Sequence, residues 1–262
     1  MPLIKETKFD KLTIRIYSDR SAAGCAAAAD GAAALGRLLK KKERVNAIFA
    51  AAPSQNETLA ALAAAPDIDW QRVRAFHMDE YVGFSRTHPQ SFGRYLDEHI
   101  FGLVPFGEVY YLDADRDDAV ERYTRLLKEN PPDIVFLGIG ENAHIAFNDP
   151  WVADFSDPAL VKKVPLDETC RAQQVHDGCF PTLADVPTHA YTLTIPALVS
   201  AQTLICTVPA ETKAEAVYNT ATKPVVADYP ATIMRCHPDA VMYCDADSGR
   251  WLLAGPGPEI AV

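Results

Sequence analysis

The sequence predicts an α/β fold: a Rossmann-like, mostly parallel sheet with helices on both faces. Short apolar runs alternate with helical segments along the chain, as in proteins built from strand–helix units. Several of these runs are apolar throughout, which is typical of strands buried in a parallel sheet. Polar and glycine residues follow them, and we expect these residues at the carboxyl edge of the sheet, where such folds bind ligands.

Length and composition favour one globular domain covering residues 1–262, without repeats or linkers. Hydrophobic residues make up 48% of the chain and charged residues 23%, which is ordinary for a folded domain. The formal net charge of −10 argues against a nucleic-acid partner, because phosphate backbones require a basic surface. It does not exclude a small anionic substrate, which a few local cations can hold.

The cysteine and histidine patterns predict no metal site. The six cysteines form no C-x-x-C pair, and no two histidines have the spacing of zinc ligands. The N-terminal residues lack the apolar core of an export signal, and no apolar run is long enough to span a membrane. We therefore expect a cytoplasmic protein without disulfides and without a membrane partner.

The first half of the chain predicts alternating strands and helices. Residues 12–17 alternate and are rich in β-branched side chains, so they predict the first strand, and Asp19 or Ser21 is a suitable N-cap for the helix that follows. That helix, residues 22–42, is rich in alanine and ends in three lysines, which suit a helix C-terminus. Further strands are predicted at 45–52 and 73–78, and helices at 57–65 and 88–99.

The second half repeats the pattern around an irregular stretch. Strands are predicted at 109–112, from 133, and at 191–195, 203–208 and 241–244, with helices at 118–129 and 211–221. Residues 151–190 show no strand periodicity and predict only a short helix at 168–175. Because long irregular segments in compact domains are often lids or binding loops, we expect that role here.

The strand that begins at residue 133 leads directly to polar residues. The run DIVFLGIG is followed by Asn142, His144 and Asp149. A histidine beyond a parallel strand suits proton transfer, and Asn142 or Asp149 would orient its ring. The alternative is structural, with His144 capping a turn and Asp149 marking the next one.

Two neighbouring carboxylates follow the strand at 73–78. Asp79 and Glu80 would point to opposite faces of an extended chain, so only one can reach a shared crevice. We expect Asp79 to lie at the same sheet edge as His144, where the two side chains suit acid–base chemistry.

The segment after the strand at 45–52 is a candidate anion site. Ser54, Gln55 and Asn56 precede a predicted helix with Asn56 as its N-cap, and a helix N-terminus favours an anion. An ordinary strand-to-helix turn explains the same residues. Lys213 starts a later helix, where a cation is unfavourable for the helix dipole, and this suggests that it serves a ligand.

Several stretches resemble the glucosamine-6-phosphate deaminase (isomerase) family. They are FHMDEYVG at 76–83, HPQSF at 88–92 and the stretch GIGENAHIAFNDP at 138–150, and the likeness extends from about residue 45 to residue 244. The MDEY sequence distinguishes the chain from 6-phosphogluconolactonases, which share the fold with a different acidic motif. The resemblance implies a fold shared with ribose-5-phosphate isomerase and a metal-free, cofactor-free conversion of glucosamine 6-phosphate to fructose 6-phosphate and ammonia.

The resemblance also implies residue roles. Asp79 would be the base that moves a proton between C2 and C1 of the sugar. His144 would open the ring by shuttling the O5 proton, and Asp149 would orient it. Lys213 matches the family's phosphate-binding lysine.

The chain departs from the family next to this histidine. The family usually has aspartate at the position of Asn142, glycine at Ala143 and the longer glutamate at Asp149. The lost carboxylate should make a protonated His144 less favourable.

The phosphate loop departs as well. A glycine-rich family loop is replaced by Ser54, Gln55 and Asn56, whose side-chain donors would have to take over, while Glu57 adds a negative charge. The family's phosphate-binding arginine aligns with Val175. Arg171, Gln174 and His176 lie within one helical turn and are the candidates to replace it.

These departures keep other functions open. One is an aldose–ketose isomerase or a lactonase-like hydrolase acting on a different phosphosugar, and another is a non-catalytic sugar-phosphate sensor. A homo-oligomer is also compatible with the sequence.

Overall fold

The predicted apolar runs form an eight-stranded sheet in a computed structural model that describes residues 2–176 and 178–255. The strand order is β1-β2-β11-β10-β7-β3-β4-β6, with only β1 antiparallel to its neighbour. The mostly parallel α/β fold is thereby confirmed. The strands are β1 (Leu3–Phe9), β2 (Leu12–Tyr17), β3 (Val45–Phe49), β4 (Val73–His77), β6 (Glu108–Tyr110), β7 (Ile134–Leu137), β10 (Thr203–Val208) and β11 (Ala240–Cys244).

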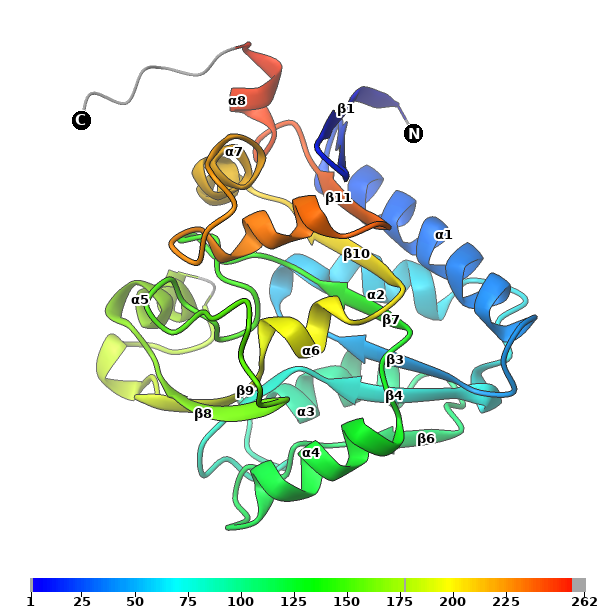
Figure 1. The fold of residues 1–262 in the computed structure, drawn as a ribbon, viewed down its shortest axis with the longest axis vertical. Coiled ribbons are helices and arrows are strands. Elements are labelled where there is room, and N and C mark those ends of the chain that lie inside the picture. Colours follow the sequence, from blue (N-terminus) through cyan, green and yellow to red (C-terminus); the bar gives the residue numbers. More distant parts are fainter. Residues whose placement is uncertain (1, 177, 256–262) are drawn as a thin grey trace.

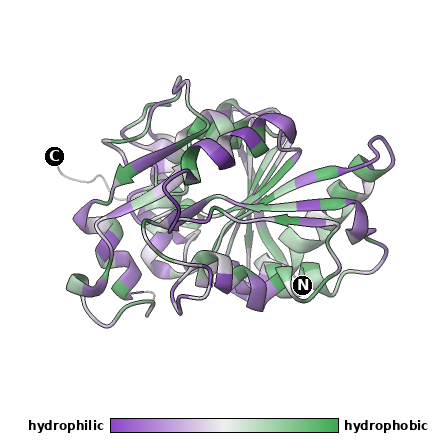
Figure 2. Cartoon of the chain, turned by 90° about the horizontal axis from the view of Figure 1, so that it is seen from below, coloured by the Kyte–Doolittle hydropathy of each residue, from purple (hydrophilic) through white to green (hydrophobic). Residues whose placement is uncertain are grey.

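Helices cover both faces of the sheet because its central strands are apolar on both sides. In β3, Val45, Ala47 and Phe49 face one hydrophobic cluster, whereas Ile48 faces the other. Figure 2 shows the hydrophobic strands in the middle of the molecule. The first cluster is covered by α1 (Arg20–Leu39), α2 (Asn56–Ala63) and α3 (Phe92–Leu96), and the second by α4 (Ala119–Glu129), α6 (Ile195–Val199), α7 (Ala214–Thr222) and α8 (Arg250–Leu253).

A second, three-stranded sheet corrects two predictions. It consists of β5 (Asp79–Tyr81), β9 (His189–Leu193) and β8 (Val161–Pro165), all antiparallel. The expectation of no strand within 151–190 was wrong, because β8 buries only two valines that are three residues apart, so period-two alternation is not visible. The strand predicted at 191–195 exists, but it pairs in this small sheet.

The small sheet and α5 (Glu168–His176) lie at the carboxyl ends of the central strands. The arrowheads of β3, β4 and β7 point toward the side of the molecule that carries α5, β8 and β9 (Figure 1). The segment 151–193 therefore adds a wall to the sheet edge where polar residues were predicted.

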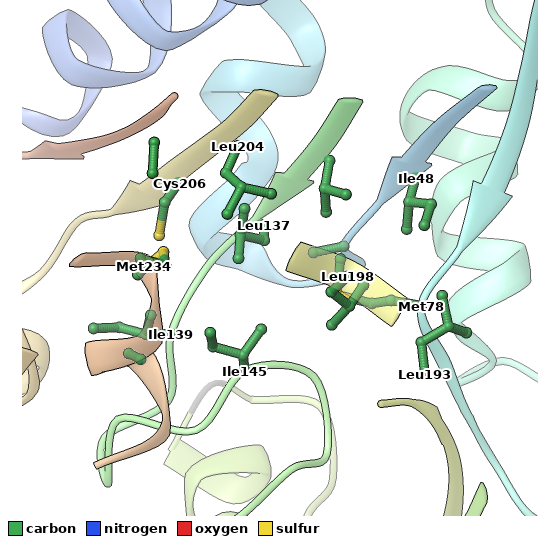
Figure 3. Packing of buried hydrophobic residues seen from close by; sticks show 14 of the residues in the cluster. Ile48, Met78, Leu137, Ile139, Ile145, Leu193, Leu198, Leu204, Cys206 and Met234 are labelled. Atoms are coloured by element: carbon green, nitrogen blue, oxygen red, sulfur yellow. The ribbon is translucent and has the colours of Figure 1, made fainter. Parts of the chain in front are cut away.

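The loop after β7 is held in the core by its own apolar residues. Ile139 and Ile145 are buried in the same cluster as Leu137 and Met234 (Figure 3). Because these two side chains anchor both ends of the polar stretch, His144 between them has a fixed position at the sheet edge.

Candidate active site

A cavity opens beyond the carboxyl ends of β3, β4 and β7. Its empty space is about 510 Å³ when the open solvent at its mouth is included. Its walls come from the segments that follow these strands, from β5 and from α5. The cavity brings together five predicted site residues, Ser54, Gln55, Asp79, His144 and Gln174, along with Gln173, Phe92, Phe147 and the glycines of the β7 loop.

Two glycines of the loop after β7 lie so close to neighbouring side chains that a Cβ atom would collide with them. A Cβ atom on Gly140 would lie 2.1 Å from Cε1 of His144, so only glycine leaves room for the imidazole ring. A Cβ atom on Gly138 would lie 2.9 Å from Nε2 of Gln55. The loop also holds Ala143 at φ 64°, a left-handed conformation that favours glycine. This explains why the related family usually has glycine at that position.

His144 is buried and faces the carboxylate of Asp149. Its Nδ1 atom lies 3.0 Å from Oδ1 of Asp149, which is fully buried. Burial alone would raise the pKa of Asp149, but His144 and then Asn142 outweigh it and lower that pKa below its ordinary value. Asp149 is therefore ionised at neutral pH and carries the negative charge that an imidazolium requires.

Asn142 links the histidine loop to two carboxylates. Its Nδ2 donates to Oδ1 of Asp149 at 3.0 Å and to Oδ2 of Asp167 at 3.5 Å, and its Oδ1 accepts from the backbone N–H of His144 at 3.1 Å. Asp167 was not predicted. It also accepts from the backbone N–H of Cys170 at 2.5 Å and from the indole of Trp151 at 3.3 Å. A second carboxylate thus lies near the site despite the asparagine.

Asp79 lines the cavity from β5 of the small sheet, just past the end of β4. It pairs with Thr192 in β9, which fixes its backbone. The side chain is buried, and burial, followed by the charge of Glu80, raises its pKa well above the ordinary value. A carboxyl group with a raised pKa is suited to give and take a proton near neutral pH.

Glu80 points away from the cavity, as the alternation along the strand predicted. Its carboxylate accepts from the Ser91 hydroxyl at 2.7 Å and from the backbone N–H groups of Phe92 and Gly93 at 3.2 and 3.1 Å. Burial nevertheless raises the pKa of Glu80 to about 7. Ser91 is also the N-cap of α3. Glu80 and the HPQSF stretch therefore fasten α3 to the cavity wall.

The segment after β3 contributes neutral donors. Pro53–Gln55 forms a short 3₁₀ turn, and Gln55 is buried. The Gln55 amide donates to the carbonyl of Thr207 and to Oγ of Ser54, both at 3.1 Å. These contacts fix the two side chains along the cavity wall.

Two expectations about this segment were wrong or incomplete. Asn56 is not an N-cap, because α2 begins at Asn56 itself and the side-chain Oδ1 of Asn56 accepts from the Tyr95 hydroxyl. That tertiary contact directs the side chain away from the cavity lining. The negative charge of Glu57 is paired with Arg20, whose Nε lies 2.7 Å from Oε1.

The residues of α5 have different surroundings. Gln174 lines the cavity, and so does Gln173, which was not predicted and whose Oε1 accepts from the backbone N–H of Glu141 at 3.1 Å. Arg171 donates to the carbonyls of Leu183 and Val186, outside the cavity lining. His176 is exposed, 3.8 Å from a carboxylate oxygen of Glu141.

Lys213 is buried at the start of α7, outside the residues that line the cavity. Its ammonium group acts electrostatically on the thiol of Cys170 in α5. The lysine is therefore near the same end of the sheet, and its role toward a ligand stays a prediction.

One group of side chains has the composition of a metal site. Within the described ranges, the ligand atoms of His144, Asp149 and Cys170 lie within 4.8 Å of one another. The sequence predicted no such site, because Cys170 is distant from the histidine in the chain.

Comparison with known proteins identifies the family. The sequence profile of the glucosamine-6-phosphate isomerases/6-phosphogluconolactonase family matches residues 18–152. The chain is 35% identical to glucosamine-6-phosphate deaminase of Listeria monocytogenes serotype 4a over 211 residues, which cover 79% of this chain and 88% of that protein. The chain belongs to this family. A glucosamine-6-phosphate deaminase of Streptococcus pneumoniae serotype 4 is 34% identical over 185 residues, covering 70% of this chain and 77% of that protein.

Solved structures support the same fold. A monomeric glucosamine-6-phosphate deaminase of the NagB superfamily has a TM-score of 0.80 at 24% identity, covering 92% of this chain and 99% of that chain. The 6-phosphogluconolactonase of Thermotoga maritima has a TM-score of 0.73 at 20% identity, and the match covers 90% of this chain and 100% of that chain. Family membership and fold, both predicted from the motifs, are confirmed.

Proposed function

We propose that this family member converts glucosamine 6-phosphate to fructose 6-phosphate and ammonia. The observation that carries the proposal is the meeting of Asp79 and His144 at one cavity, with Asp149 behind the imidazole ring. Relatives named glucosamine-6-phosphate deaminase, at 34–35% identity, support it.

His144 opens the sugar ring in this proposal. The C1–O5 bond breaks while the imidazole takes the proton of the C1 hydroxyl and gives a proton to O5. An imidazolium exists during this transfer, and the ionised Asp149 beside Nδ1 stabilises it. Asn142 fixes the position of Asp149 relative to His144, because it hydrogen-bonds to the carboxylate of Asp149 and to the backbone N–H of His144.

Asp79 then moves the proton of C2 to C1. Asp79 takes the C2 proton while a proton of the substrate ammonium group passes to O1, which gives a neutral enolamine. Asp79 then returns its proton to C1, which leaves a protonated carbon–nitrogen double bond at C2. Water adds there, the C2–N bond breaks, and ammonia leaves. A substrate ammonium group beside Asp79 lowers the pKa of that carboxyl group, so binding itself favours the ionised base.

The phosphate group requires donors at the other side of the cavity. We assign Ser54, Gln55 and Gln174 as neutral donors and Lys213 as the cation. The first three line the cavity, and Lys213 is buried near its end of the sheet. Asn56, Arg171 and His176 have contacts elsewhere and are not part of this assignment.

The test is ammonia release from a panel of hexosamine 6-phosphates, with fructose 6-phosphate measured alongside. Wild type should release both products from glucosamine 6-phosphate. Asp79→Asn should lose turnover by roughly 100-fold or more, since a positioned base contributes about 10²–10⁴. Substrate binding by calorimetry should be largely kept. Asp117→Asn, the same change at an exposed aspartate, is the matched control.

The neutral donors after β3 favour a second candidate, the same ring opening and proton shift on a different phosphosugar. Wild type would then isomerise an amine-free aldose phosphate, or hydrolyse a phosphosugar lactone, and release no ammonia from any hexosamine phosphate. Tight binding without turnover on any compound would instead indicate a sensor.

No helix among residues 2–176 and 178–255 is both long and apolar enough to cross a membrane. A cytoplasmic location, a homo-oligomer and the lack of a cofactor stay predictions from the sequence.

A further inference from the structure

Three side chains with different donor atoms meet next to the cavity. His144 and Asp149 come from the loop after β7, and Cys170 comes from α5. All three are buried, with exposed fractions of 8%, 0% and 1%. Their ligand atoms lie within 4.8 Å of one another. A nitrogen, an oxygen and a sulphur donor thus converge on one point from two separate elements.

One of these groups has unused capacity for a ligand. The Nδ1 atom of His144 is paired with Oδ1 of Asp149 at 3.0 Å, but Oδ2 of Asp149 is buried and makes no hydrogen bond of standard geometry among the described residues. Because an unsatisfied buried polar atom is costly, a cation bound at this carboxylate would remove a penalty already present in the fold.

The donor set selects the kind of cation. Zinc binds thiolate at about 2.3 Å and imidazole or carboxylate at about 2.0–2.2 Å, so two ligands of one tetrahedral ion lie roughly 3.3–3.8 Å apart. The observed spacing reaches this range with small side-chain shifts. A thiolate ligand disfavours magnesium and calcium, which prefer oxygen donors.

The surrounding charges are mixed but mostly negative. The carboxylates of Asp149, Asp167 and Asp79 act electrostatically on the Cys170 sulphur, and the ammonium group of Lys213 acts in the opposite sense. Because the pKa of Asp79 is raised, only Asp149 and Asp167 are counted against Lys213, and the net negative charge that they leave favours a cation at this point.

We propose that His144, Asp149 and Cys170 form a zinc site whose occupation inhibits the enzyme. On binding, the thiol S–H bond breaks, its proton passes to solvent, and a sulphur–zinc bond forms without any change of oxidation state. The bound ion holds the imidazole and the carboxylate, so they no longer serve proton transfer. The binding part stands by itself, whereas the inhibition rests on the proposed function.

The test of binding uses Co²⁺ as a spectroscopic substitute for Zn²⁺. Titration of metal-free wild type should give one equivalent bound, with a thiolate-to-cobalt charge-transfer band that Zn²⁺ abolishes and Mg²⁺ does not. Cys170→Ser should lose the band and weaken binding by more than about 100-fold, because even changes outside the ligand set cost roughly 10–100-fold. Cys236→Ser, at an exposed cysteine, should behave as wild type.

Several results would overturn the site. They are a wild type without a charge-transfer band, a band that survives in Cys170→Ser, or a band lost in Cys236→Ser. Should Cys170→Ser fold poorly, as judged by circular dichroism, His144→Gln serves as the second variant. It must lose the binding while keeping the fold.

The test of inhibition compares each variant with its own uninhibited rate. Zn²⁺ should inhibit wild type and Cys236→Ser reversibly, with activity restored by a chelator, and should inhibit Cys170→Ser at a concentration about 100-fold higher. A wild type that binds Co²⁺ and turns over substrate, yet is insensitive to Zn²⁺, would refute the inhibition and leave the proposed function intact. If wild type has no turnover but shows the cobalt band, the proposed function fails and the metal site stands.

Discussion

The loops after β3 and β7 follow neighbouring buried strands, yet they bring opposite kinds of group to the cavity. The β7 loop supplies His144 with the buried charge of Asp149. The β3 segment supplies the hydroxyl of Ser54 and the amide of Gln55, and the Gln55 amide donates to Oγ of Ser54 and to the carbonyl of Thr207. The difference separates two tasks, proton transfer at the charged wall and recognition at the neutral wall.

Both walls depart from the family pattern, and they do so with different consequences. At the charged wall, Asn142 replaces a carboxylate but bridges Asp149 to another one, Asp167. At the neutral wall, the family's glycine-rich loop is replaced by Ser54 and Gln55. Among the described residues that line the cavity, the segment after β3 contributes no glycine. We therefore expect the chemistry to be retained, with the phosphate group held at the neutral wall by side-chain donors in place of backbone N–H groups.

The largest expected effect is at the charged wall. Asp149→Asn keeps the shape of the side chain and removes its charge, so a protonated His144 loses its counter-ion. We expect kcat/KM to fall by roughly 100-fold or more, in the range of general acid–base contributions. Steady-state kinetics with glucosamine 6-phosphate measures it. A rate within a few-fold of wild type would show that the charge on this wall is dispensable.

A smaller effect is expected at the neutral wall. Gln174→Leu removes a donor from the cavity with little change in volume. We expect KM to rise by about tenfold with kcat nearly unchanged, because a hydrogen bond to a charged group contributes about 1.5–3 kcal/mol. Arg171→Gln, on the same helix but bonded to the backbone of the 183–186 segment, is the control that should leave KM unchanged. A loss of kcat in Gln174→Leu would contradict the division of tasks.

Asn142→Asp tests the bridge between the carboxylates. The change removes the donor to Asp149 and puts a negative charge beside Asp149 and Asp167. In wild type the lowered pKa of Asp149 stabilises the fold above about pH 4, and this stability is lost as pH falls through that lowered pKa. The variant should lose about 1–3 kcal/mol at neutral pH and little under acidic conditions. Denaturant unfolding at several pH values measures this, and a pH-independent difference would rule out repulsion.

The smallest effect is expected at Ala143. Ala143→Gly removes the strain of the left-handed conformation at φ 64°, which stabilises the fold by about 1 kcal/mol. It also removes a buried methyl group, which destabilises the fold by a similar amount. We expect the free energy of unfolding to stay within about 1 kcal/mol of wild type. Ala197→Gly, in α6, has no strain to relieve and should cost about 1–2 kcal/mol by comparison. Equal losses in both variants would show that the loop is not strained.

Much of the fold followed from local sequence. The strands β2, β3, β4, β7, β10 and β11 are apolar or alternating runs that end at clear breaks, and Asp19 caps α1 as expected, accepting from Ala22 at 2.8 Å. The small sheet was not predicted as such. Its strand β5 has only three residues, and its pairing joins segments about a hundred residues apart, which no local pattern reports.

The site divides in the same way. The position of Asp79 and His144 at the cavity could be predicted because each follows an apolar run, which is a local signal. Asp167, Gln173 and Cys170 reach the site through the packing of α5 and its approach, so nothing in their neighbouring sequence marks them. Asn56 was misplaced because a tertiary contact with Tyr95 outcompetes its capping tendency.

The closeness of Gly140 to His144 has a consequence for proton transfer. Because the backbone at Gly140 lies against the imidazole, with a Cβ there falling within 2.4 Å of three ring atoms, one side of the ring is closed to any ligand. The ring therefore cannot tilt toward Gly140. Since an imidazole nitrogen gives and takes its proton in the ring plane, the main chain at Gly140 helps to fix the direction in which His144 exchanges a proton.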